Sequence, residues 1–365
     1  MPVTSREAIR NAKHYRSARS IESVKRERGL STVIKLAGNE NNLGCSPAAK
    51  QALNDCRSVD LARYPDHNCT RLKAKLTVDL GINADQLIFG NGSFELLSLI
   101  AQTFLEYGDE SVIPQPTFGW YRLATLNMGA NVVPVPLQDH VIDLEGVLRS
   151  VTGRTRIVWI CNPNNPTGTV VEGSVLVSFL ERLSSNILVV LDEAYCDYLD
   201  VPGYPDTVEL IRRFPNIISL RTFSKVHGLA SLRLGYGISS PEIIAEIGKV
   251  KMPSNVNFAV QEAALASLND LEFRKKVLAN NSLGKRMYAE RLSALGLGFI
   301  PTHGNFIMLD TGADSESVVE EFLNQGIIIR GGHEFGMPSW LRITIGTEEE
   351  NRLVLDLLEK IVRPV

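Results

Sequence analysis

The stretch that decides the fold and the chemistry is RTFSKVHGLASLRLGYG, residues 221–237. The apolar and β-branched run NIISL (216–220) precedes it and predicts a buried strand. Lys225 therefore follows the end of that strand, where burial lowers the pKa of an amine and makes it a nucleophile. The side chains of Thr222, Ser224 and Arg233 are suited to holding a phosphate beside it. A reactive lysine next to a phosphate site is what a pyridoxal phosphate (PLP) enzyme requires, although a solvated loop lysine fits the same residues.

Length and composition are those of a soluble globular protein with more than one domain. The chain has 365 residues, of which 44% are hydrophobic and 22% are charged. The net charge of −3 argues against a general nucleic-acid binder. The polar beginning of the chain is unlike a secretory leader, and no apolar run reaches the roughly 18–20 residues of a membrane span. Five cysteines, an odd number without metal-site spacing, predict reduced thiols, a cytoplasmic location and no metal.

Apolar strands alternate with helical patterns along the first two thirds of the chain. The candidate strands are LIFGNGS, ESVIPQP, NVVPVPL, RIVWICN, NILVVLDE, NIISLRT and LGYGIS. This order predicts an α/β fold whose mostly parallel seven-stranded sheet is sandwiched by helices. Ligands bind such sheets at the carboxyl ends of the strands, where the polar motifs of this chain also lie.

The pattern divides the chain into three parts. Residues 1–44 are expected to form an N-terminal arm that packs with the small domain. Residues 45–250 form the large, PLP-binding domain, and residues 251–365 form a smaller α+β domain after the break at PSN (253–255).

Several polar and aromatic residues at predicted strand ends fit a bound cofactor. Asp192 follows NILVVL, and a buried carboxylate needs a cation such as a protonated pyridine nitrogen, although it can also cap the next turn. Tyr195 and Asn165 can hydrogen-bond a phenolate-like oxygen. Phe118 offers a flat face for stacking, although the usual place of such an aromatic residue is the core. Arg342 lies in an apolar strand, so it needs an anionic partner such as a substrate carboxylate or phosphate.

Nine motifs in order across almost the whole chain carry a resemblance to a known family. They are KLAGNENNLGCSP, RYPD, GNGSFELL, PTFGWY, CNPNNPTG, LDEAYCDY, RTFSKVHGLASLRLGY, NFIMLD and GIIIRGGHEFGMPSWLRITIGTEEEN. The sequence resembles the fold-type I PLP-dependent aminotransferases of class I/II, in the branch that contains histidinol-phosphate aminotransferase.

The resemblance implies a role for each matching residue. Lys225 matches the lysine that binds PLP covalently and moves a proton, Asp192 the partner of the pyridine nitrogen, and Tyr195 a third catalytic residue. The remaining cofactor contacts are expected at Asn165, Phe118, Gly92, Ser93, Phe94, Thr222, Ser224 and Arg233. Tyr64 matches a tyrosine that reaches the neighbouring subunit, which implies a homodimer. Arg342, Arg330, Tyr15 and Asn39 match substrate-binding positions.

The implied activity is transamination of histidinol phosphate with 2-oxoglutarate or glutamate, a step of histidine biosynthesis. Three departures from the branch pattern concern the substrate pocket: Phe94 replaces an aspartate, Val226-His227 replaces Ala-Phe, and Arg352 is shifted along the last helix. An aromatic amino acid aminotransferase and a PLP-dependent amino-acid-phosphate decarboxylase therefore stay as alternatives. A PLP-sensing transcriptional regulator is disfavoured, because residues 1–40 are too short for a DNA-binding domain. For His227 a packed or solvated imidazole is favoured over a catalytic one.

Overall fold

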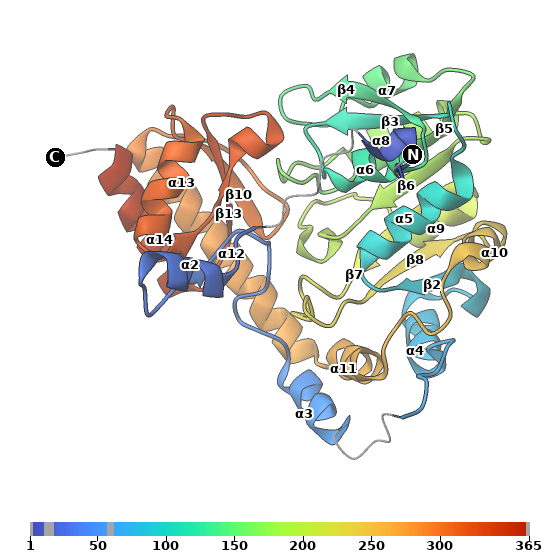
Figure 1. Ribbon diagram of the computed structural model, residues 1–365, viewed down its shortest axis with the longest axis horizontal. Helices are drawn as coiled ribbons and strands as arrows, with labels where there is room; N and C mark the ends of the chain where they lie inside the picture. Colours follow the sequence, from blue (N-terminus) through green and yellow to red (C-terminus); the bar gives the residue numbers. More distant parts are fainter. Residues whose placement is uncertain (1–2, 11–17, 57–61, 363–365) are drawn as a thin grey trace.

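The structure is a computed structural model that describes residues 3–10, 18–56 and 62–362. Two bodies lie side by side, a large one around a seven-stranded sheet and a small one that carries roughly the C-terminal quarter of the chain (Figure 1). The large sheet has the order β2-β8-β7-β6-β5-β3-β4. All of its neighbouring strands are parallel except β8, which runs antiparallel to β2 and β7. The predicted mostly parallel seven-stranded sheet is confirmed. Its strands are β2 (Leu87–Gly90), β3 (Glu110–Gln115), β4 (Asn131–Pro136), β5 (Thr155–Cys161), β6 (Leu188–Asp192), β7 (Ile217–Thr222) and β8 (Gly235–Ser239).

Both faces of the large sheet are buried, because its strands are apolar at nearly every position. On β5, Trp159 and Cys161 belong to the core on one face, whereas Val158 and Ile160 belong to the core on the other. Helices on the face of Trp159 and Cys161 cover the first core; they are α5 (Ser93–Phe104), α6 (Trp120–Asn127) and α10 (Pro241–Val250). The second is closed by α3 (Pro47–Asp55), α4 (Thr70–Leu80), α7 (Leu144–Ser150), α8 (Gly173–Arg182), α9 (Thr207–Arg213) and α11 (Phe258–Asn269). The sheet is thus sandwiched between two helical layers.

The small body is built on a four-stranded antiparallel sheet of order β12-β13-β10-β9. Its core contains Tyr288 and Leu292 from α12, Phe322 from α13 and Val354 from α14. A short parallel pair joins β1 to β11. The elements are β1 (Ile34–Lys35), α12 (Leu271–Leu295), β9 (Gly298–Ile300), β10 (Phe306–Asp310), α13 (Ser315–Asn324), β11 (Ile327–Ile328), β12 (Arg330–Gly331), β13 (Trp340–Thr344) and α14 (Glu348–Val362).

The N-terminal segment contacts both bodies. Helix α2 (Ile21–Arg28) packs on the small body, where Val24 shares a core with Leu323 and Arg28 pairs with Glu320. The short helix α1 (Glu7–Arg10) lies instead against α6 of the large body, and Arg6 Nη2 donates to the Asn127 carbonyl at 2.5 Å. Helix α11, which follows residue 250, packs in the core of the large sheet. The division of the chain into three parts stays a prediction.

Helices in the described part of the chain are too short or too polar to cross a lipid bilayer.

The register of the large sheet places the predicted site at one edge. Asp192, the last residue of β6, lies opposite Cys161 of β5 and Leu220 of β7. Thr222 ends β7, and Lys225 follows three residues later. The carboxyl ends of three adjacent parallel strands therefore present Cys161, Asp192 and Thr222 side by side, facing the small body.

Candidate active site

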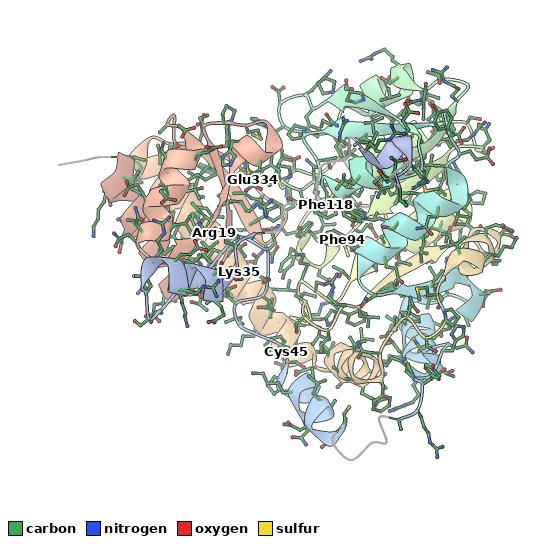
Figure 2. All side chains as sticks on the ribbon, viewed as in Figure 1. Arg19, Lys35, Cys45, Phe94, Phe118 and Glu334 are labelled. Carbon is green, nitrogen blue, oxygen red and sulfur yellow. The ribbon has the colours of Figure 1, made fainter. Side chains whose placement is uncertain are left out.

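A cavity of about 1450 Å³ lies at the carboxyl edge of the large sheet and extends to the small body. Figure 2 shows Phe94 and Phe118 on the large body, and Lys35 and Glu334 on the side of the small body. The predicted site residues in its wall are Asn39, Ser93, Phe94, Phe118, Asn165, Asp192, Tyr195, Thr222, Ser224, Lys225, Arg233, Arg330 and Arg342. The structure thus brings together residues that span some 300 positions of the sequence.

Lys225 lies in the cavity wall just beyond β7. Its Nζ donates to the Gly38 carbonyl at 3.1 Å and lies 5.5 Å from the centre of the Tyr195 ring. Burial lowers the pKa of this amine to about 8, and the nearby Arg342 acts in the same direction. About one tenth of the amine is therefore uncharged at pH 7 and able to attack a carbonyl carbon.

Asp192 is 4% exposed and has no ion-pair partner among the described residues. Burial raises the pKa of this carboxyl to about 6. Two hydrogen bonds oppose that rise, from Tyr121 Oη at 2.7 Å and from the Ala194 backbone N–H at 3.1 Å. The carboxylate is therefore mostly ionised at pH 7 and is suited to a cationic ring nitrogen, which is the observation that best fits PLP.

Tyr195 is the centre of a buried hydrogen-bond network. Its hydroxyl oxygen accepts from Asn39 Nδ2 at 2.9 Å and from Asn165 Nδ2 at 3.2 Å. Burial raises the pKa of this phenol, so it stays protonated. None of the residues described accepts the Tyr195 proton, which leaves it available for the ring oxygen of a cofactor.

The predicted phosphate-binding residues meet where α5 begins. Gly92 precedes Ser93 with φ +83°, and a Cβ on Gly92 would overlap the Arg233 guanidinium. Arg233 Nη1 lies 3.4 Å from Ser224 Oγ, and the backbone N–H of Ser224 donates to Thr222 Oγ1 at 3.1 Å. Backbone N–H groups at the N-terminus of a helix, two hydroxyls and a guanidinium form a cradle suited to a phosphate dianion.

Two aromatic rings form the wall on the large body. The rings of Phe94 and Phe118 meet edge to face, with centroids 5.1 Å apart. Phe118 also contacts Tyr121 edge to face at 5.5 Å. Phe94 thus brings an aromatic side chain to the cavity at the position where the resemblance leads one to expect an aspartate.

Two arginines approach the cavity from the small body. Arg330 of β12 and Arg342 of β13 pair with each other in register, and both are buried. Arg342 donates to Asn165 Oδ1 at 2.6 Å and to the Ala37 carbonyl at 2.8 Å. Arg330 forms an ion pair with Glu334 at 2.6 Å. Paired guanidinium groups of this kind are suited to a carboxylate or phosphate on a substrate.

Two residues singled out in the sequence lie outside the cavity wall, and a third is not among the described residues. Tyr64 is 92% exposed and outside the cavity wall of this chain. Tyr15 lies outside the described residues. His227 faces away from the cavity: its Nδ1 lies 2.8 Å from Ser267 Oγ and its ring packs on Phe223. Of the two non-catalytic placements expected from the sequence, packed or solvated, this geometry is the packed one.

The sequence reasoning missed Tyr121 and Glu334. Tyr121 lies three residues after Phe118. At the start of a helix this spacing puts both rings on one face, so it could have indicated that Tyr121 lies near the site. Glu334 lies four residues after Arg330 in GIIIRGGHEFG, a spacing that brings two side chains together only when the segment turns.

Comparison with known proteins gives a consistent result. The family model described as aminotransferase class I and II matches residues 31–358. A histidinol-phosphate aminotransferase of Brevibacillus brevis is 44% identical over 357 residues, which cover 98% of each chain. One of Moorella thermoacetica is 44% identical over 98% of this chain and 92% of its own. The structure is also similar to that of histidinol-phosphate aminotransferase from Sinorhizobium meliloti in complex with pyridoxal-5'-phosphate, with a TM-score of 0.91, 27% identity, and coverage of 98% and 97% of the two chains.

An aspartate aminotransferase of Thermus thermophilus, 22% identical, has a TM-score of 0.83 and covers the full length of both chains, so the fold itself is shared more widely. The match of the family model over most of the chain, together with full-length relatives above 40% identity, decides the family. The chain belongs to the class I and II aminotransferases.

Proposed function

We propose that this protein is a PLP-dependent aminotransferase that exchanges the amino group of histidinol phosphate with 2-oxoglutarate, or in reverse with glutamate. The observation that carries the proposal is the content of one cavity: an amine of lowered pKa at Lys225, a buried carboxylate at Asp192, and two arginines on the opposite wall. Transamination with a bound cofactor needs the amine and the carboxylate for the cofactor and the arginines for the substrate anion.

The residues around the cavity fit PLP. When bound, the cofactor carries the amino group between substrates and accepts the electron pair left by a departing proton. Asp192 would hold the proton on the ring nitrogen, because an ionised buried carboxylate favours a cation beside it. Tyr195 would donate its free hydroxyl proton to the ring oxygen, Phe118 would cover one face of the ring, and the cradle at Gly92 and Arg233 would hold the phosphate.

Lys225 has two tasks in this proposal. Its uncharged amine first anchors the cofactor. When its Nζ is not holding the cofactor, Lys225 would take the proton from the substrate Cα and return it to the cofactor, as general base and then acid. Arg342 is already held in place by its hydrogen bonds to Asn165 and Ala37. It would bind the substrate anion so that the Cα proton points toward Lys225.

Histidinol phosphate is the substrate favoured by the full-length relatives, which carry that name at 40–44% identity. An aromatic amino acid is the second candidate. It is favoured by the apolar side chains of Leu123, Leu126 and Phe335 in the cavity wall. Decarboxylation stays as a further alternative, distinguished by release of CO2 without need for a 2-oxo acid.

A homodimer belongs to the same proposal. Tyr64 is 92% exposed and Met252 70%, and the segments that carry them are joined by a hydrogen bond from the Ser254 N–H to His67 Nδ1 at 2.9 Å. Exposed apolar side chains on adjacent segments suit a contact with a second copy, in which Tyr64 would reach the partner's phosphate site. A cytoplasmic location is supported by the five free cysteines.

The test is a set of half-reactions followed by absorbance. The PLP-loaded enzyme is mixed separately with histidinol phosphate, phenylalanine, tyrosine and glutamate, and loss of the cofactor's long-wavelength band is recorded. We expect histidinol phosphate and glutamate to convert the cofactor fastest and 2-oxoglutarate to restore it. Faster conversion by phenylalanine would favour the aromatic alternative, and CO2 release would favour the decarboxylase.

Replacement of the proposed base provides the control for the chemistry. Lys225→Ala should lower turnover by at least about a thousandfold, because it removes the group that moves the proton. Lys285→Ala, a partly buried lysine outside the cavity wall, is the matched control and should retain turnover. Turnover in the Lys225→Ala enzyme equal to that of the wild type would refute the assignment of Lys225 as the proton-transferring base.

A further inference from the structure

The two arginines that line the cavity do not have equivalent surroundings. Arg342 is held by neutral oxygens, from Asn165 and Ala37. Arg330 is held by a carboxylate, since its Nη2 lies 2.6 Å from Glu334 Oε2 with the two side chains 10% and 22% exposed. An ion pair this sheltered interacts more strongly than a surface pair, because little water screens it.

The geometry of the turn fixes Glu334 beside Arg330. The 3-10 turn Gly332–Phe335 follows β12 directly, and a Cβ on Gly332 would overlap the carbonyls of Met337 and Trp340. Next to Glu334, the Phe335 ring contacts both guanidinium groups, with its centroid 5.8 Å from Arg330 Cζ and 5.3 Å from Arg342 Cζ. The turn thus inserts an aromatic ring and a carboxylate into the anion-binding wall.

We propose that Glu334 is a specificity-determining residue that sets the charge of this wall, so that the same two arginines accept both a singly charged carboxylate and a doubly charged phosphate. The inference rests on the proposed function, because it assumes that Arg330 and Arg342 receive the substrate anion. Glu334 and Glu40 are the glutamates in the described cavity wall, and Glu40 is already paired with Lys35 at 2.7 Å.

The charge balance gives the direction of the effect. With Glu334 present, Arg330, Arg342 and Glu334 together carry one positive charge. A phosphate ester carries nearly two negative charges at neutral pH and a carboxylate carries one, so Glu334 repels the phosphate about twice as strongly. The carboxylate of Glu334 therefore reduces the preference for phosphate that the same two arginines would give without it. This keeps the carboxylate-bearing partner competitive in the second half of the cycle.

The experiment uses Glu334→Gln in the PLP-loaded enzyme. We expect the ratio of kcat/KM for histidinol phosphate to that for glutamate to rise about tenfold, through KM rather than kcat. Inorganic phosphate and acetate are also measured as competitive inhibitors of the glutamate half-reaction, and phosphate inhibition should become stronger relative to acetate. Because these inhibitors are not transaminated and the reaction they inhibit uses glutamate, this second measurement tests Glu334 even if histidinol phosphate is not the substrate.

Three further variants separate specificity from structure. Glu334→Asp keeps the charge and should keep the wild-type ratio. Glu316→Gln removes a neighbouring glutamate that is 72% exposed and outside the cavity wall, so it should change neither ratio. In an Arg330→Gln background, Glu334→Gln should lose most of its effect on phosphate inhibition, since the carboxylate acts beside that arginine.

The proposal is overturned by either of two results. Equal losses for phosphate and carboxylate ligands in Glu334→Gln would assign Glu334 to holding Arg330 in place without selecting charge. Unchanged ratios in a variant whose melting temperature equals that of the wild type would remove Glu334 from substrate selection altogether.

Discussion

Removal of the Tyr121 hydroxyl should disturb the charge of Asp192 without opening the core. The hydroxyl donates to Asp192 Oδ2 at 2.7 Å, and the fully buried ring stacks on Trp159 with centroids 5.3 Å apart. Tyr121→Phe keeps that stacking and the contact with Phe118, so the packing loss is small. What it removes is a hydrogen bond to the charged form of a buried carboxyl.

The magnitude follows from the strength of that bond. A hydrogen bond to a charged group contributes about 1.5–3 kcal/mol, so its loss should raise the pKa of Asp192 by about one to two, from about 6. At pH 7 the ionised fraction would fall from about nine tenths to between about one half and one tenth. If the ionised carboxylate supports PLP binding, the Kd for PLP rises about two- to tenfold at pH 7, and the difference fades above about pH 9.

The assay is the Kd for PLP of the apoenzyme between pH 6 and pH 9.5, expressed as the ratio of variant to wild type. The other titratable groups that act on Asp192 in the structure are Glu193, Lys225, Tyr195 and the Cys161 thiol. They are present in both proteins, so the ratio reports the lost hydroxyl. A matched control is Tyr288→Phe, which removes another buried hydroxyl that has no described hydrogen-bond partner.

The result that refutes the reasoning is a ratio that does not depend on pH. A constant ratio above one would mean that Tyr121 acts only through packing, and a ratio of one throughout would mean that its hydrogen bond does not affect the charge of Asp192 where PLP binds. An infrared titration of the apoenzyme, with Asp192→Asn as the blank, checks the pKa shift independently of PLP.

Two further predictions concern the cradle and the lysine. Gly92→Ala should weaken PLP binding by about tenfold or more, because the added Cβ overlaps the Arg233 guanidinium and the residue has a positive φ. Pyridoxal, which lacks the phosphate, should bind nearly as well as before. Gly153→Ala, where a Cβ meets nothing within 4 Å, is the control, and an equal loss for pyridoxal would contradict the assignment of the cradle. The rate at which the apoenzyme captures PLP is measured by borohydride trapping at Lys225. It should rise with pH through a midpoint near 8 and level off above about pH 9, since the pKa of that amine is lowered to about 8 from 10.5 and only its uncharged form attacks. A midpoint near 10.5 would show that burial does not free the amine.

The sequence allowed the large sheet and the polar ends of its strands to be predicted because both signals are local. Each apolar run, such as the one before Asp192, is followed immediately by polar residues, and in a parallel sheet such ends meet at one edge. Lys225, Asp192 and Thr222 therefore came together as expected.

Contacts between side chains and helices that lie far apart in the sequence were harder to predict. Nothing local in the sequence indicates that the Tyr121 hydroxyl reaches Asp192, 71 positions away, or that α1 lies against α6 while α2 lies on the small body. Such contacts depend on the angle at which a helix or an arm packs, which apolar periodicity does not determine. For Glu334, the four-residue spacing to Arg330 was visible, but the segment had no helical pattern to suggest that the two side chains meet.

The orientation of the Asn165 side-chain amide links Arg342 on one side of the cavity to Tyr195 on the other. Asn165 Oδ1 accepts from Arg342, which leaves Asn165 Nδ2 facing the Tyr195 hydroxyl. A reversed amide would place an N–H against the guanidinium, and a guanidinium has no acceptor to offer it. Arg342, on the small body, therefore sets the direction from which Tyr195, on the large body, receives a hydrogen bond. A substrate anion that draws Arg342 away also changes what Tyr195 can donate at the ring oxygen, so replacements of Arg342 should alter the cofactor's absorbance as well as substrate affinity.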